Sequence, residues 1–150
     1  MLDKLATHKG ESPRTDVGMG LDFLGKVSQK RSIVFLFSDF QSPPFEDAMR
    51  VLRRRNDVVA LTVEDRYEVQ LPTAGLLALQ DAESGETMVV DTQAGGVREQ
   101  FEKLAVKRRE ALGNLFSAMH VDHLELFADE DLVEALVMFF RLRKRRASRV

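Results

Sequence analysis

The sequence contains no cysteine among its 150 residues. This absence excludes a disulfide framework, a thiolate nucleophile and a zinc site with cysteine ligands, and it fits a reducing compartment. The longest apolar stretch, residues 132–140, contains Glu134 and is too short to span a bilayer. The first eleven residues lack the apolar core of a secretory signal peptide. We therefore expect a cytoplasmic protein without a transmembrane segment.

Motifs of several large enzyme classes are also missing. The sequence has no P-loop, no Gly-x-Gly-x-x-Gly after a predicted strand, no Gly-x-Ser-x-Gly nucleophile elbow and no zinc-protease helix. Gly18 and Gly20 fall inside a predicted helix rather than in a strand-to-helix turn, so we do not expect them to cradle a phosphate. These absences favour a non-enzymatic protein.

Charge is unevenly distributed along the chain, although the net charge is only −2. Residues 141–150 form a basic tail that carries six of the 22 basic side chains and no acidic one. The rest of the chain has 16 basic and 24 acidic side chains. Such a tail either contacts nucleic acid or anionic lipid, or complements the negative end of a helix and stays solvated. The acidic body argues against a nucleic-acid partner.

The residues that are present have the pattern of one α/β domain. A hydrophobic content of 44% with 31% charged residues suits a single soluble domain with a core. Five apolar runs predict strands at residues 33–37, 58–63, 76–79, 87–90 and 123–127. The third and fourth runs flank a polar turn with Gly85, which predicts a β-hairpin. The other three alternate with predicted helices, which implies right-handed parallel crossovers.

Four helices are predicted from capping residues and from the helical spacing of apolar residues. They begin at Thr15 or Asp16, after Pro43-Pro44, near Gly96, and at Asp129 or Asp131. The expected buried positions are Val17, Leu21, Leu24 and Val27 in the first helix; Phe45, Ala48, Met49 and Leu52 in the second; and Val97, Phe101, Leu104, Ala105, Leu112, Leu115 and Phe116 in the third.

The apolar run at residues 33–37 is unbroken, which is typical of a strand that is covered on both faces. We expect it to lie beside the strand at residues 58–63, with the strand at residues 123–127 beyond. No predicted strand remains for its other side, and natural proteins usually protect an apolar edge. Either another polypeptide covers this edge, which includes self-association, or the sequence is the C-terminal portion of a larger domain. We favour the second interpretation.

Asp39 follows this strand directly, at the sheet edge where α/β proteins bind ligands. Its carboxylate either caps the next turn or binds a cation. Glu64, Asp65 and Glu68 form a second acidic group, for which solvated loop carboxylates are the simpler interpretation. His120 and His123 straddle a predicted helix end without a third ligand, so we expect surface and loop residues rather than a zinc site.

Several segments, in this order and spacing, resemble one family. They are Arg14-Thr15-Asp16, Arg31-Ser32-Ile33-Val34, Ser38-Asp39-Phe40, Asn56-Asp57-Val58-Val59, Asp65-Arg66-Tyr67-Glu68, Leu71-Pro72, Gly75, Asp81-Ala82-Glu83-Ser84-Gly85-Glu86, Val90-Asp91-Thr92 and Phe139-Phe140-Arg141. The chain resembles the C-terminal half of DUF58 proteins, which contain a von Willebrand factor A-like domain. The resemblance implies a partial von Willebrand A-like (Rossmann-like) parallel sheet flanked by helices, with a β-hairpin insertion. Residues 1–150 would then be the C-terminal portion of that domain.

The resemblance also implies a metal site and a partner. Von Willebrand A-like domains often hold a divalent cation through an Asp-x-Ser-x-Ser motif, a Thr and an Asp; Thr15 and Asp39 match the last two. Hydroxyl and carboxylate oxygens suit Mg²⁺ in the complete domain. This chain lacks the Asp-x-Ser-x-Ser motif, so we do not expect it to bind the ion tightly alone.

The implied function is a non-enzymatic protein-interaction module, whose partner is a protein such as a MoxR-like AAA+ ATPase. The alternative is a Mg²⁺-dependent phosphoryl-transfer or nucleotide-binding α/β domain that uses Asp39 and Glu64-Asp65.

Overall fold

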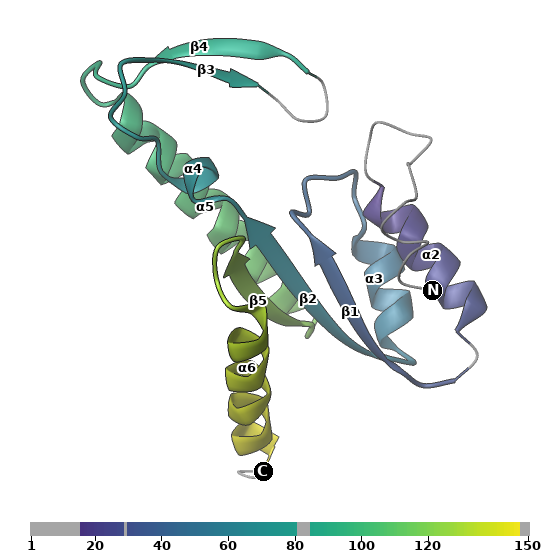
Figure 1. Ribbon diagram of the computed structural model, residues 1–150. Coiled ribbons are helices and arrows are strands. Elements are labelled where there is room, and N and C mark those ends of the chain that lie inside the picture. Colours follow the sequence, from purple (N-terminus) through teal and green to yellow (C-terminus); the bar gives the residue numbers. More distant parts are fainter. Residues whose placement is uncertain (1–15, 29, 81–84, 148–150) are drawn as a thin grey trace, which may run out of the picture.

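The computed structural model describes residues 16–28, 30–80 and 85–147. In this part of the chain three parallel strands form a sheet in the order β1 (Ile33–Ser38), β2 (Asp57–Glu64), β5 (Asp122–Phe127). Helices α2 (Val17–Val27), α3 (Glu46–Arg53) and α5 (Val97–Ala118) each precede a sheet strand along the chain, and α6 (Leu132–Ala147) follows the last one (Figure 1). The predicted α/β class and the predicted strand order are both confirmed.

The central strand β2 is buried on both faces. Val58 and Ala60 point into a core formed with α2, α3 and α5, where Phe116 is completely buried. Val59 and Leu61 point to the opposite face, where α6 covers them. An apolar run without alternation is therefore explained for β2 by helices on both sides.

The prediction that the first strand is covered on both faces is wrong for the described residues. β1 lies at an edge of the sheet, and its outer-face residues Ile33, Phe35 and Phe37 are 58%, 40% and 53% exposed. The cause is the position of α6, which packs over β5 and β2. Its Phe140 reaches β1 edge-on, with ring centroids 5.9 Å from Phe35. No described strand pairs with the other side of β1.

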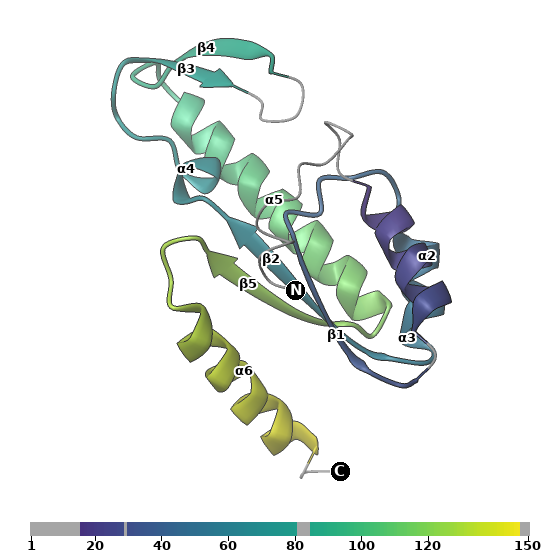
Figure 2. The same cartoon turned by 45° about the vertical axis from the view of Figure 1, so that its right-hand side comes forward.

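The predicted hairpin is confirmed as β3 (Leu76–Gln80) and β4 (Thr87–Asp91), an antiparallel pair that is separate from the sheet. It lies beyond the N-terminal end of α5 (Figure 2). Arg98 connects the helix to the chain before the hairpin, because its guanidinium donates to the carbonyl of Leu71 and to the hydroxyl of Thr73. A short helix that the sequence did not predict, α4 (Arg66–Val69), follows β2.

The structure confirms predicted helix caps, but some side chains that were predicted to be buried are exposed. Asp16 caps α2 by accepting from the N–H of Met19, and Asp131 accepts from two N–H groups at the start of α6. Val27 and Leu104, which were predicted to be buried, are exposed. No described element covers those sides of α2 and α5, so helical spacing alone overestimated the core. No helix in the described ranges is long and apolar enough to cross a membrane.

We expect Phe116→Ala to lower the free energy of unfolding by about 3–5 kcal/mol, because it removes a fully buried ring. Phe37→Ala, on the open face of β1, should lower it by roughly 1 kcal/mol or less. Urea unfolding of both variants measures the difference. Similar large losses would mean that the outer face of β1 is buried in solution.

Candidate functional site

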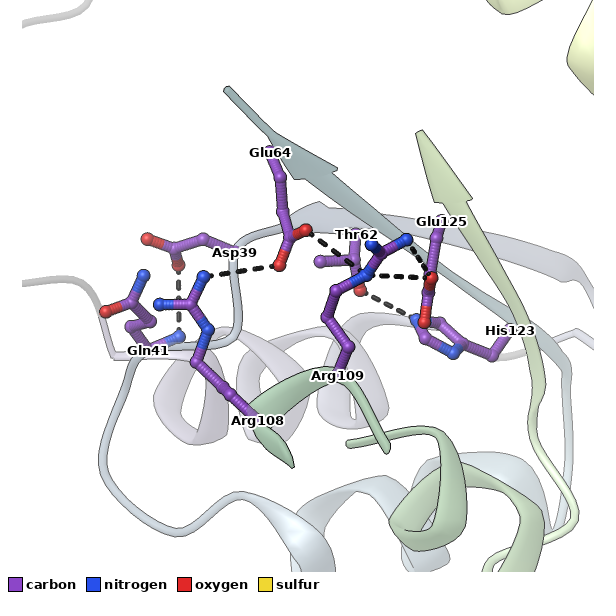
Figure 3. A network of polar contacts seen from close by, with 8 residues as sticks. All are labelled: Asp39, Gln41, Thr62, Glu64, Arg108, Arg109, His123 and Glu125. Carbon is purple, nitrogen blue, oxygen red and sulfur yellow. Dashed lines mark hydrogen bonds and ion pairs between the residues drawn. The ribbon is translucent and has the colours of Figure 1, made fainter. Parts of the chain in front are cut away.

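The candidate site lies at the carboxyl ends of the sheet strands, which we call the upper end. Asp39 follows β1, and Glu64 ends β2. Arg108 and Arg109 reach this end from α5, which covers one face of the sheet (Figure 3). In open parallel sheets this end is where ligands usually bind.

Asp39 is exposed and sits in a tight turn. Its Oδ1 accepts from the N–H of Gln41 at 3.1 Å, and the N–H of Phe40 donates to the hydroxyl of Ser38 at 3.0 Å. Phe40 has φ +56°, a left-handed conformation that costs free energy for a bulky residue. Its buried ring offsets that cost by packing against Phe45 and Phe116 at centroid distances of 5.5 and 4.9 Å. The turn therefore fixes the position of the Asp39 carboxylate.

The turn-capping option for Asp39 is thus observed, whereas metal binding is not tested. Thr15, the other predicted ligand, lies outside the described residues. Within the described ranges, no group of three or more His, Asp or Glu side chains is arranged to hold a metal ion. The carboxylate of Asp39 fits one position in the coordination sphere of a hard cation, and the remaining ligands would have to come from elsewhere.

Glu64 is buried, which corrects the prediction of a solvated carboxylate. It forms ion pairs with Arg108 and Arg109 at 3.4 and 3.5 Å. Arg109 also binds Glu125 of β5 at 2.5 Å, so one guanidinium links β2 to β5 (Figure 3). A buried carboxylate requires such partners because desolvation penalises an isolated charge. Asp65 remains exposed, as predicted, and caps α4.

The alternation of β2 contained the signal that the sequence interpretation missed. Even-numbered residues of this strand, from Val58 to Thr62, face the α5 side, and Glu64 continues the series. A carboxylate in that series needs a cation from the facing helix. The adjacent pair Arg108-Arg109 in the long predicted helix was the natural candidate.

His123 lies on β5, in agreement with the strand predicted at residues 123–127, and is partly buried, which corrects the separate expectation of a surface or loop residue. Its Nε2 is 2.7 Å from the hydroxyl of buried Thr62, and its ring lies 4.8 Å from that of Phe116. Burial lowers the pKa of His123, and this effect exceeds the opposing influence of Glu125; nearby Arg109 lowers the pKa further. His120 is exposed and takes no part in this contact.

At the opposite end of the sheet, part of the basic tail is structured. Arg143 binds Asp57 at 2.5 Å and Asp122 at 3.0 Å, so it joins the starts of β2 and β5. These carboxylates raise the pKa of its guanidinium above the usual value, with the hydrogen bond to Asp57 as the main cause. The alternative in which the whole tail stays solvated is therefore wrong at Arg143.

One family model and several curated relatives match the chain. A family model described as protein of unknown function DUF58 matches residues 1–111. An uncharacterized protein of Mycobacterium avium is 30% identical over 137 residues, which cover 89% of this chain and 79% of the relative. Uncharacterized proteins of Mycobacterium tuberculosis and Mycobacterium bovis are each 29% identical over 135 residues, which cover 42% of their length. The chain thus spans less than half of these two relatives. No solved structure matches.

The lowered pKa of His123 predicts a specific pH dependence of stability. Between this lowered pKa and about 6.5, the unfolded chain binds more protons at this position than the folded chain, so the free energy of unfolding should rise with pH. His123→Gln should reduce that rise, whereas His120→Gln should preserve it. Urea unfolding between about pH 5 and 8 measures it. An unchanged slope in His123→Gln would contradict the assignment.

Proposed function

The chain belongs to the DUF58 family, and we propose that it is a non-enzymatic protein-interaction module with a von Willebrand factor A-like architecture. The observation that carries this proposal is the open edge of β1. An apolar edge strand with unpaired backbone groups is a site at which another strand can be added. Natural sheets rarely leave such an edge uncovered, and no described strand pairs with it, which supports a further segment as its cover.

Both faces of the sheet expose apolar side chains near this edge. Ile33, Phe35 and Phe37 are exposed on the face that α6 only partly covers. On the other face α2 lies beyond α3 (Figures 1 and 2) and exposes Phe23 and Val27. This arrangement supports an added strand that brings its own helical cover on each face.

We infer that the added strand belongs to a longer domain, of which residues 1–150 form the C-terminal portion and residues 141–150 the basic tail. The greater length of the M. tuberculosis and M. bovis relatives supports this inference. The remaining portion would supply the Asp-x-Ser-x-Ser ligands that von Willebrand A-like domains use.

Asp39 is the proposed contact residue of the module. Its carboxylate is exposed, belongs to the loop after β1 and is held in place by the buried ring of Phe40. In the complete domain, Asp39 and Thr15 would hold Mg²⁺ together with ligands from outside the described residues. A Mg²⁺ ion supplies a coordination position that a carboxylate of a partner protein can occupy.

The first partner to test is a MoxR-like AAA+ ATPase, which the family resemblance suggests. The alternative function, Mg²⁺-dependent phosphoryl transfer or nucleotide binding, is not favoured by any observation on the described residues. Glu64, one of the acidic residues it would use, is already paired with two arginines.

Asp39→Ala should weaken binding to a MoxR-like ATPase at least tenfold, roughly 1.4 kcal/mol. Asp91→Ala is the matched control, because Asp91 is also exposed and accepts from the N–H two residues later. Isothermal titration calorimetry measures both. Equal affinities for the wild type and Asp39→Ala, or equal losses in both variants, would contradict the proposed contact.

A further inference from the structure

The end of the molecule opposite Asp39 brings together three basic segments that lie far apart in the sequence. Because the strands are parallel, the amino ends of β1, β2 and β5 meet there with the C-terminal ends of α2, α3, α5 and α6 (Figures 1 and 2). We call this the lower face and define it by eight exposed cations: Lys26, Lys30, Arg31, Arg50, Arg54, Arg55, Arg141 and Arg145.

Two adjacent hollows show that these segments meet. One, of about 450 Å³, is lined by Arg31, Arg53 and Arg143. The other, of about 360 Å³, is lined by Lys26, Arg54 and Arg55. Asn56 lines both and is buried, with its amide bonded to Ser32 and Leu52, so the floor between the hollows is fixed.

The eight cations of the lower face have no carboxylate partner in the part of the chain that the structure describes. By contrast, Arg66, Arg108 and Arg109 at the upper end are all paired with carboxylates. The lower face therefore has an uncompensated positive potential, although the chain as a whole is slightly acidic.

The acidic residues of this end do not cancel that potential. Asp57 and Asp122 are both bound by Arg143. Asp22 lines the smaller hollow, where it faces three cations, Lys26, Arg54 and Arg55. Neutralisation of helix ends explains cations in the last turns of α2 and α3. It does not explain Lys30 and Arg31, which lie outside any helix.

Two of the three basic segments also expose an aliphatic side chain. Val51 and Leu142 are 59% and 50% exposed, and each is within four residues of a cation of the lower face. Nucleic-acid phosphates gain little from aliphatic contacts, whereas the interface of a lipid bilayer buries such side chains between its charged headgroups. We propose that the lower face binds the surface of a bilayer that contains anionic phospholipids.

This attachment is peripheral and reversible. Each basic residue near an anionic membrane strengthens binding about fivefold, and the effect declines within a Debye length. A face of eight cations from three segments would orient the molecule with its upper end, and Asp39, away from the bilayer. The inference is independent of the partner proposed for Asp39.

The test is co-sedimentation of the full chain with vesicles of phosphatidylcholine, with or without phosphatidylglycerol. Binding is expected only with phosphatidylglycerol. Arg54→Gln combined with Arg55→Gln should weaken it roughly 30-fold. The matched control, Lys103→Gln with Lys107→Gln, removes two exposed cations from α5 and should change the affinity by less than about twofold.

Val51→Ser separates the lipid from a nucleic acid as the ligand. We expect it to weaken vesicle binding several-fold, because it removes an aliphatic group without a change in charge. Vesicle binding that needs no phosphatidylglycerol, or equal losses in the two double variants, would overturn the proposal. So would preferential binding to duplex DNA that Val51→Ser does not alter. If the Arg54/Arg55 variant does not fold by circular dichroism, the single variant Arg31→Gln and the salt dependence of wild-type binding decide the same question.

Discussion

Burial of β2 between two helical layers is the constraint on which the rest of the structure depends. Its alternate residues enter two separate cores, one with α3 and α5 and one with α6. The same alternation carries Glu64 into the α5 side, where the carboxylate is stable only because Arg108 and Arg109 bind it. Phe40 and Phe116 extend the α5-side core to the turn that positions Asp39. The positions of Glu64 and Asp39 at the upper end therefore depend on packing in the α5-side core.

The two ends of the sheet differ in electrostatics for a reason that follows from topology. Parallel strands place the loops that follow a strand at one end, and the C-termini of the helices that lead into the next strand at the other. At the upper end Arg108 and Arg109 form ion pairs with Glu64 and Glu125. Asp39 is exposed there. At the lower end Arg143 binds Asp57 and Asp122, and the eight cations of the lower face are exposed. An interaction module with a partner at one end and a membrane surface at the other is consistent with this polarity.

The sequence predicted what depends on local chemistry. The Asx turn at Asp39, the caps at Asp16 and Asp131, and the strand order all follow from neighbouring residues or from the alternation of helices and strands. The predictions from the sequence were wrong where burial depends on an element that is distant in the sequence. Residues 33–37 and 58–63 are similar apolar runs, yet only the second is covered on both faces, because α6 packs over β2 and β5. The burial of Glu64 likewise depends on Arg108 and Arg109, which are 44 and 45 residues away in the sequence.

The central claim is that β1 has an outer edge that another part of a longer domain covers. Hydrogen–deuterium exchange of this chain and of the longer M. tuberculosis relative tests it most directly. The account predicts that the β1 amides exchange much faster than those of β2 in this chain, and that the corresponding two strands are protected equally in the relative. Slow exchange of β1 in the monomeric chain, or fast exchange of the matching strand in the relative, would contradict the account.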